Sequence, residues 1–317
     1  MIKKIIRSVL FISGLALILT VSSIFMAPKK DIYNVSAFEH KVNDLEGEKD
    51  NTIDVVFLGD SEVYSAYSPL QMYHEYGFTS YICATSAQRL CDTYAMVQEI
   101  YKTQQPKVVV IESNCFFRYG GMADETGDKV MDKVLDYVPA MKYKSKFKTV
   151  FYPGIDKEES SMKGFRYRTD INSYHGGKWM HESEQKEDIR KVNLDYFKKI
   201  YNYIIEQGSE VVFVTTPSPD CHDYKKHNAM KYLAKEYGLE YYDLNLVSDE
   251  IGIDWINETR DGGNHLNYAG AEKVTSYFGN ILDKEHELPD HREDAEYSGW
   301  DEAFEKYAEK VGYNKEI

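Results

Sequence analysis

A serine that follows the first predicted strand of the chain could act as a nucleophile. Gly59, Asp60 and Ser61 come directly after residues 53–58, a nearly continuous apolar run. Such runs are typical of strands buried on both faces, as in parallel sheets. A tight turn there can expose the serine hydroxyl, with the serine N–H beside it as a donor to an oxyanion. The same tripeptide is also ordinary turn and helix-capping sequence.

A histidine late in the chain could be the base for that hydroxyl. Asp261 stands four positions before His265, just ahead of a predicted helix over 269–282. A serine needs a base to take its proton, and the base needs an acceptor on its other nitrogen to hold one tautomer. One loop can supply both groups. The alternative is a loop histidine beside a helix cap, and Asn264 and Asn267 are themselves read as turn or cap residues.

An asparagine at the end of another predicted strand could complete such a site. Asn114 follows residues 107–111, the third strongly apolar run. Its amide N–H could point at the same oxyanion, and a turn-forming asparagine is an equal alternative. Each of the three signals is weak by itself. Together, in the order serine, asparagine, aspartate–histidine at strand ends, they favour one catalytic site.

The elements that must position these residues alternate between strands and helices. Strands are predicted over 53–58, 79–83, 107–111, 210–215 and 239–244, and helices over 87–103, 224–237 and 269–282. This alternation predicts one α/β domain, residues 52–283, with a parallel sheet and helices on both faces. The pattern fails over 116–186, which is predicted to be an insertion at the carboxyl edge of the sheet, where open α/β folds bind ligands.

These motifs resemble those of the SGNH/GDSL hydrolases, whose first block is Gly-Asp-Ser and whose last is an aspartate and a histidine before the final helix. The resemblance implies a three-layer flavodoxin-like fold, catalytic Ser61, His265 and Asp261, and an oxyanion hole that includes the Ser61 N–H and Asn114. One extra residue separates Asp261 from His265 here, so either the loop bulges or His265 works largely in a dyad.

The second block departs from the family pattern, because no glycine follows the second strand. The remaining oxyanion donor is therefore expected to be the backbone N–H of Ser86 or Ala87. The predicted insertion offers substrate-binding side chains, namely Tyr119, Arg166, Tyr167 and Arg168. The two arginines could pair with phosphate or carboxylate groups. Exposed solubilising arginines are the alternative.

The amino terminus predicts a membrane anchor within residues 1–30. Lys3, Lys4 and Arg7 precede residues 9–27, which carry no charge. At about 1.5 Å per residue this run would form about 28 Å of helix, close to a bilayer core. A single-pass anchor with the domain outside the cytoplasm is favoured over a cleaved signal peptide. Residues 31–51 are then a polar lead-in segment.

Anchored proteins with these motifs resemble extracytoplasmic proteins that act beside membrane-bound O-acyltransferases in cell-wall or teichoic-acid acylation. The resemblance implies an esterase or O-acyltransferase acting on acyl esters of a surface glycan or wall polymer. The alternative is a catalytically inactive binding or scaffold module that partners a membrane-bound acyltransferase. An acidic tail, residues 284–317, with a helix over 300–311, ends the chain.

Charge and cysteine content exclude several function classes. The net charge of −14, from 52 acidic and 38 basic side chains, argues against nucleic acid as a partner. No cofactor or metal is expected, and a phosphatase-like metal enzyme is least favoured, because no clustered ligand set is visible. The four cysteines match no zinc pattern and are read as free thiols, with disulfides as the alternative: Cys83, Cys91, Cys115 and Cys221.

Overall fold

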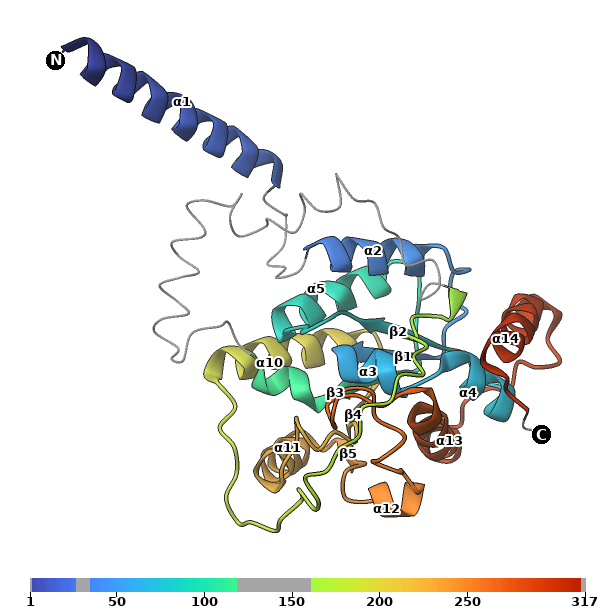
Figure 1. Cartoon of the computed structure of the whole chain (residues 1–317). Helices are drawn as coiled ribbons and strands as arrows, with labels where there is room; N and C mark the ends of the chain where they lie inside the picture. Colours follow the sequence, from blue (N-terminus) through green and yellow to red (C-terminus); the bar gives the residue numbers. More distant parts are fainter. Residues whose placement is uncertain (1, 27–34, 119–160, 315–317) are drawn as a thin grey trace.

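The computed structural model describes residues 2–26, 35–118 and 161–314, in which a central sheet of five parallel strands runs in the order β2-β1-β3-β4-β5 (Figure 1). The strands are β1 (Val55–Gly59), β2 (Ser80–Ala84), β3 (Val108–Glu112), β4 (Glu210–Thr215) and β5 (Glu240–Asp243). This strand order is that of flavodoxin-like sheets. The prediction of a parallel α/β fold is therefore confirmed.

Helices cover both faces of this sheet, as the alternating pattern predicted (Figure 1). One face carries α2 (Val35–Glu46), α5 (Leu90–Ile100), α10 (Lys191–Glu206) and α11 (Tyr224–Tyr237). The other face carries α3 (Ser61–Ala66), α4 (Pro69–Tyr76) and α13 (Tyr268–Glu285), with α14 (Ser298–Val311) against α4. Shorter elements are η1 (Ser113–Phe117), α12 (Ser248–Ile251) and η2 (Ala295–Tyr297).

The register of the strands brings the predicted site residues to one edge of the sheet. Gly59 pairs with Ala84, and Leu58 pairs with Ile111, so the turns after β1, β2 and β3 leave the sheet side by side. Val, Ile and Phe side chains fill both faces of these strands, which are wholly buried. Some of the many tyrosines pack in this core, since Tyr67, Tyr73 and Tyr81 are among its largest fully buried side chains.

Two regions differ from what the sequence predicted. Residues 31–51 are not simply a polar lead-in, because α2 buries Phe38 and Leu45 in the core. The helix α10 was not predicted, although Phe197, Ile200 and Ile204 recur at helical spacing and are fully buried. The 3.6-residue period of these apolar positions was the available signal.

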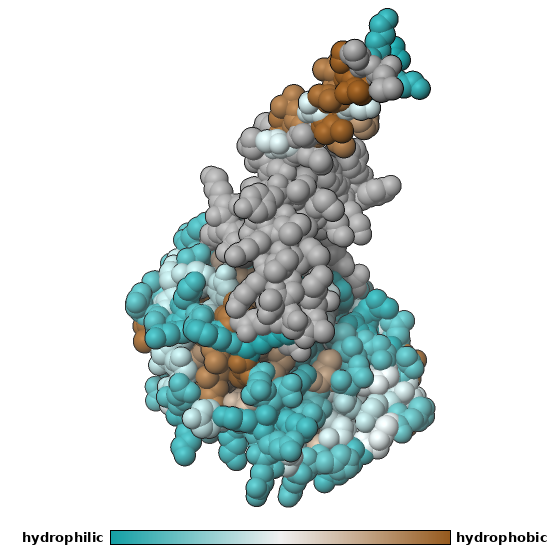
Figure 2. Space-filling model, turned by 90° about the vertical axis from the view of Figure 1, so that its left-hand side faces the viewer, coloured by the Kyte–Doolittle hydropathy of each residue, from teal (hydrophilic) through white to brown (hydrophobic). Residues whose placement is uncertain are grey.

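The amino-terminal segment forms α1 (Ile2–Met26). Figure 2 shows a largely hydrophilic face of the domain, with apolar side chains such as Leu10 and Phe11 exposed along α1. A membrane anchor was predicted for residues 1–30. Among the residues described by the structure, no helix combines the length and the apolarity that crossing a bilayer requires.

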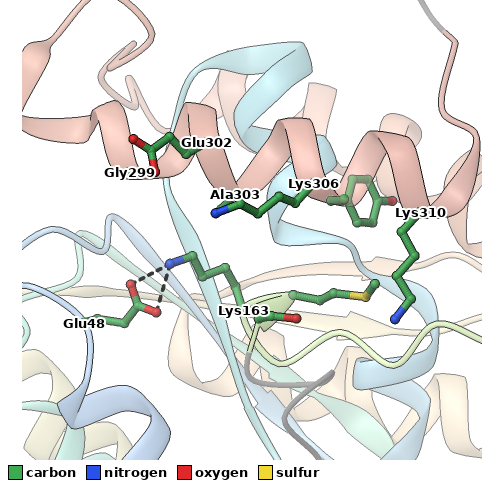
Figure 3. A pocket seen from close by; sticks show the side chains of 10 residues that line it. Glu48, Lys163, Gly299, Glu302, Ala303, Lys306 and Lys310 are labelled. Carbon is green, nitrogen blue, oxygen red and sulfur yellow. Dashed lines mark hydrogen bonds and ion pairs between the residues drawn. The ribbon is translucent and has the colours of Figure 1, made fainter.

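The carboxyl-terminal segment packs onto the domain. In α14 the side chains of Trp300 and Tyr307 are buried against the core. A hollow of about 400 Å³ lies beside this helix, where Lys163 binds Glu48 through two hydrogen bonds of 2.9 and 2.7 Å (Figure 3). The helix predicted over 300–311 is therefore present, and it begins slightly earlier, at Ser298.

Candidate active site

Ser61, His265 and Asp261 form a continuous hydrogen-bonded series. The Oγ of Ser61 lies 2.7 Å from Nε2 of His265, and Nδ1 of His265 lies 2.5 Å from Oδ2 of Asp261. The carboxylate holds the proton on Nδ1, which leaves Nε2 as the acceptor for the serine hydroxyl. The side chain of His265 is only 13% exposed. Segments separated by about two-thirds of the chain thus meet in the geometry of a serine nucleophile and its base.

The turn after β1 holds Ser61 as the first residue of α3. A Cβ on Gly59 would come within 2.7 Å of the Cβ of Glu112 and 2.5 Å of a Val63 methyl, so β1 can end this close to β3 only with glycine. The side chain of Asp60 caps α3 by accepting a 3.0 Å bond from the N–H of Glu62. The glycine and aspartate of the motif therefore fix the turn that presents the serine.

The extra residue between Asp261 and His265 is accommodated by a bulged loop. Gly262 and Gly263 adopt φ values of 79° and 101°, which favour glycine. The loop is closed at its base by a bridge between Thr259 and Leu266. The backbone N–H of His265 also donates to Oδ1 of Asp261, at 2.7 Å. Of the two alternatives drawn from the sequence, the bulge is observed, and Asp261 is the partner of His265.

Alanine at the two loop glycines should have unequal effects. A Cβ on Gly262 would meet nothing within 4 Å, whereas one on Gly263 would lie 2.8 Å from the ring of Tyr174. We expect Gly262→Ala to lower the free energy of unfolding by about 1 kcal/mol, because alanine is strained in a left-handed backbone conformation. Gly263→Ala should lower the free energy of unfolding by about 2 kcal/mol or more and should also lower kcat, because either the loop or the Tyr174 ring must move. Urea unfolding and steady-state kinetics measure both, and equal effects would contradict this geometry.

The electrostatics of the loop keep Asp261 ionised. Partial burial alone would raise the pKa of Asp261, but the hydrogen bonds from the His265 ring and backbone lower it below its ordinary value. Arg260 adds a positive charge, with its Nε 3.9 Å from Oδ2 of Asp261. The Arg260 guanidinium also donates to Oγ of Ser65 at 2.9 Å, which ties the loop to α3. Sequence reasoning did not select Arg260, although it adjoins the predicted acid.

Asn114 does not lie as the sequence predicted. Its Nδ2 donates to Oε1 of Glu62 at 3.0 Å and to Oδ2 of Asp60 at 3.2 Å. Both amide hydrogens are thereby engaged with carboxylates, so the side chain is not available to an oxyanion in this arrangement. Asn114 instead joins the turn after β3 to the turn after β1.

The turn after β2 contains the two other predicted oxyanion donors. Ala87 has a φ of 53°, a left-handed conformation that a glycine would adopt at no steric cost. Ser86 is exposed and Ala87 is partly buried, and the turn is fixed by a 2.9 Å bond from the Thr85 N–H to the Gln88 side chain. Ala87 thus has the backbone conformation expected at the position of the missing family glycine. The roles of both N–H groups stay predictions.

The predicted substrate-binding arginines have other partners. Arg166 stacks its guanidinium 4.4 Å from the ring centre of Tyr64 in α3, the helix that begins at Ser61. Arg168 pairs with Asp170 at 2.7 Å on the surface, where both side chains are half exposed. Tyr119 lies outside the residues that the structure describes. Arg166 therefore lies over the nucleophile's helix, and Arg168 is occupied by a surface ion pair.

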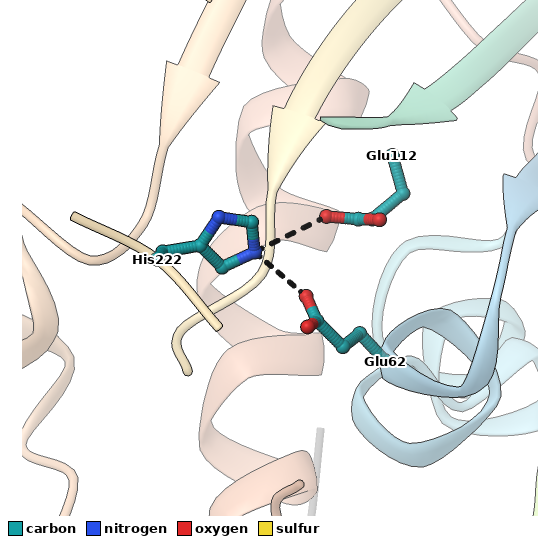
Figure 4. Close-up of side chains that lie close together, drawn as sticks. All are labelled: Glu62, Glu112 and His222. Atoms are coloured by element: carbon teal, nitrogen blue, oxygen red, sulfur yellow. Dashed lines mark hydrogen bonds and ion pairs between the residues drawn. The ribbon is translucent and has the colours of Figure 1, made fainter. Parts of the chain in front are cut away.

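A buried polar cluster lies behind the nucleophile, and sequence reasoning missed it. Glu62 in α3, Glu112 at the end of β3 and His222 in the segment after β4 converge here (Figure 4). Nε2 of His222 lies 2.8 Å from Oε2 of Glu62 and 3.7 Å from Oε1 of Glu112, and all three side chains are at most 1% exposed. Each residue looks like a turn residue in the sequence. Their convergence follows only from the strand order, which brings those turns together.

These three residues could be considered as metal ligands, although the sequence predicted none. One ligand atom from each lies within 4.8 Å of the others. The 2.8 Å between Glu62 and His222 is a hydrogen-bond distance, shorter than the ~3.3 Å that separates ligand atoms around tetrahedral zinc. The other oxygens of the two carboxyl groups, Oε1 of Glu62 and Oε2 of Glu112, accept hydrogen bonds from the side chain and the N–H of Asn114. The arrangement fits a hydrogen-bonded acid cluster better than a metal centre.

Burial favours the protonated forms of the two glutamates in this cluster. Burial, and then the neighbouring Asp60 carboxylate, raise the pKa of Glu62 to about 8. Burial also raises the pKa of Glu112 well above its ordinary value. Arg118 pairs with Asp60 and supplies one positive charge. Uncompensated buried carboxylates are costly, so Glu62 is expected to hold a proton at neutral pH.

The raised pKa of Glu62 predicts a pH-dependent stability. A carboxyl whose pKa is higher in the folded state stabilises the fold fully below the unfolded pKa, about 4.3, and loses that contribution as pH rises to about 8. Glu62→Gln mimics the protonated form, so its melting temperature relative to wild type should rise between pH 5 and pH 9. Glu236→Gln, on the exposed surface of α11, is the control. A pH-independent difference for Glu62→Gln would contradict the prediction.

Comparison with known proteins identifies distant structural neighbours. A scan against protein-family models gives no match, and neither does a search of curated proteins. One neighbour is a structure from Bacteroides fragilis that is described as an acylhydrolase. Its sequence is 12% identical to this chain, the match covers 81% of this chain and 100% of the neighbour, and the TM-score is 0.39. A lipase/acylhydrolase from Enterococcus faecalis is 10% identical over 75% and 98%, with a TM-score of 0.38.

A third neighbour is described as a platelet activating factor from Streptococcus pneumonia. It is 14% identical over 79% of this chain and 92% of its own, with a TM-score of 0.36. Likenesses this distant say nothing about the reaction, which must be argued from this chain's own geometry.

Proposed function

We propose that this chain is a serine esterase or O-acyltransferase of the SGNH/GDSL type, with Ser61 as nucleophile, His265 as base and Asp261 as the orienting acid. The observation that carries the proposal is the 2.7 Å contact between Ser61 Oγ and His265 Nε2, backed by Asp261. An inactive scaffold was the alternative, and a splayed or blocked pair would have favoured it. The contact observed is the one that an active enzyme requires.

The proposed reaction passes through an acyl-enzyme. His265 Nε2 takes the proton of Ser61 as Oγ attacks the carbonyl carbon of an ester. The oxyanion accepts hydrogen bonds from the Ser61 N–H and from a backbone N–H in the turn at Ser86 and Ala87. The ester C–O bond then breaks, and His265 returns the proton to the leaving alcohol. Water, or a hydroxyl of an acceptor, releases the acyl group by the same steps in reverse.

We further propose that the ester is carried by a surface glycan or wall polymer and that the domain works outside the cytoplasm, beside a membrane-bound acyltransferase. The support is the resemblance of the motifs and of the apolar amino-terminal run to extracytoplasmic proteins of that kind. Cell fractionation with protease accessibility tests the location. A protein recovered only in the cytoplasm would contradict it.

Purified protein tests the reaction class. Acetyl, longer-acyl and aminoacyl esters should be offered with and without glycan acceptors, and both the free acid and any acylated acceptor measured. Release of acid from at least one ester class is expected, and faster acyl loss with an acceptor would show transfer. No turnover of any ester by protein with intact folding would contradict the proposal.

A further inference from the structure

An aromatic hollow lies beside the loop that carries Asp261 and His265. Its volume is about 560 Å³, within the range of about 300–1,000 Å³ typical of small-molecule sites. We use the name aromatic hollow for the space lined by Tyr174, Trp179, Tyr224, Asn245, Asp249 and Trp255. Two of the three tryptophans of the chain line it.

Three rings form a fixed wall of the aromatic hollow. Trp179 and Trp255 meet edge to face, with ring centres 5.0 Å apart and planes at 80°. Tyr174 packs against both, at 6.0 and 6.3 Å. The indole N–H of Trp179 donates to Oδ1 of Asn245 at 3.2 Å, and the Tyr174 N–H donates to the Trp255 carbonyl at 2.9 Å. These bonds hold the rings in place without a ligand, so little ordering would be needed on binding.

The aromatic hollow and the catalytic loop share their supports. The Tyr174 ring lies so close to Gly263 that a Cβ there would come within 2.8 Å of it. Gly263 is two residues before His265, so the two Cα atoms are at most about 7 Å apart. Asn245 also accepts from the N–H of Ser218, whose hydroxyl donates to the Asn264 carbonyl at 2.8 Å. The aromatic hollow and the catalytic loop are therefore adjacent and are joined through Tyr174 and Asn245.

We propose that the aromatic hollow binds a saccharide ring of the substrate, the sugar that bears or receives the acyl group at Ser61. This inference rests on the proposed function. Flat aromatic faces pack against the C–H face of a sugar ring, and their amphipathic character tolerates the wet edge of such a site. Asp249, Glu182 and Ser248 line the hollow and can hydrogen-bond hydroxyl groups.

A quaternary ammonium group is the other ligand that aromatic rings select. The polar lining does not match it. Lys178, Glu182 and Asp249 bring charges of both signs to the hollow, and the hydroxyl of Ser248 would find no hydrogen-bonding partner on such a cation. Mixed charges and neutral polar groups suit a neutral polyhydroxylated ring.

Sugar binding is measured best without turnover, on the Ser61→Ala protein. Chitotetraose and cellotetraose are titrated while tryptophan fluorescence is recorded, with choline chloride as the third probe. We expect a saturable change with at least one oligosaccharide, weakened about tenfold or more by adding Trp255→Ala. Trp300→Phe, a tryptophan in α14 that does not line the hollow, should leave the affinity unchanged. No response to either oligosaccharide, or saturable binding of choline alone, would overturn the inference.

Kinetics separate this inference from the proposed function. In protein with Ser61 intact, Trp255→Ala should raise KM for acetylated oligosaccharide about tenfold more than it raises KM for p-nitrophenyl acetate, which has no sugar ring, and Trp300→Phe should change neither. Equal losses on both substrates would contradict a sugar site. Oligosaccharide binding by a protein without any esterase activity would contradict the catalytic proposal and leave the sugar site standing.

Discussion

Replacing Ser61 with alanine should lower kcat on any ester substrate by about 10⁴- to 10⁶-fold, the range seen when the nucleophile of other serine hydrolases is removed. The reason is chemical, because the acyl group has no oxygen to which it can transfer. Substrate binding should change little, so KM should stay within a few-fold. Ester hydrolysis by the purified variant, followed over hours with product detection, measures this.

The control for Ser61→Ala is Ser298→Ala, at the exposed start of α14. It removes the same hydroxyl far from the triad and should keep wild-type activity. Both variants should keep the wild-type melting temperature within a few degrees, since a single hydroxyl is lost in each. A Ser61→Ala protein that hydrolyses esters at the wild-type rate would rule out the proposed nucleophile.

Replacing His265 with glutamine should cause a loss of comparable size, about 10⁴- to 10⁶-fold in kcat, because no group then takes the serine proton. Asp261→Asn should lower kcat by less, about 10³- to 10⁴-fold, since the imidazole remains but its tautomer is no longer fixed. Combining Ser61→Ala with His265→Gln should add little to either single loss. A His265→Gln protein that keeps more than a tenth of wild-type kcat would contradict the role of the base.

The strands were predictable because their sequences carry one unambiguous signal. Residues of β1, β3 and β4 are runs of Val, Ile and Phe buried on both faces, and each was predicted within about two residues of its observed ends. Ser61 and His265 followed from their places at strand and helix boundaries. The bulge at Gly262 and Gly263 could not be chosen in advance, because it depends on how the loop packs against Tyr174.

The features that could not be predicted from the sequence are contacts between residues far apart in the chain. Asn114 looked free to reach an oxyanion, but it is held by the Glu62 and Asp60 carboxylates. Those bonds depend on the buried charge behind the nucleophile, which no local pattern reveals. The aromatic hollow likewise joins Trp179 and Trp255, from segments far apart in the sequence. Local sequence propensity does not predict such contacts, because they depend on how the strands and helices pack in the folded chain.

The most direct test of the catalytic centre is intact-protein mass spectrometry after treatment with a fluorophosphonate, followed by peptide mapping. We expect one added phosphonyl group per molecule, located on Ser61, and labelling that slows by several orders of magnitude in His265→Gln. A label on another residue, or an esterase that stays fully active and unlabelled at Ser61, would contradict the central claim.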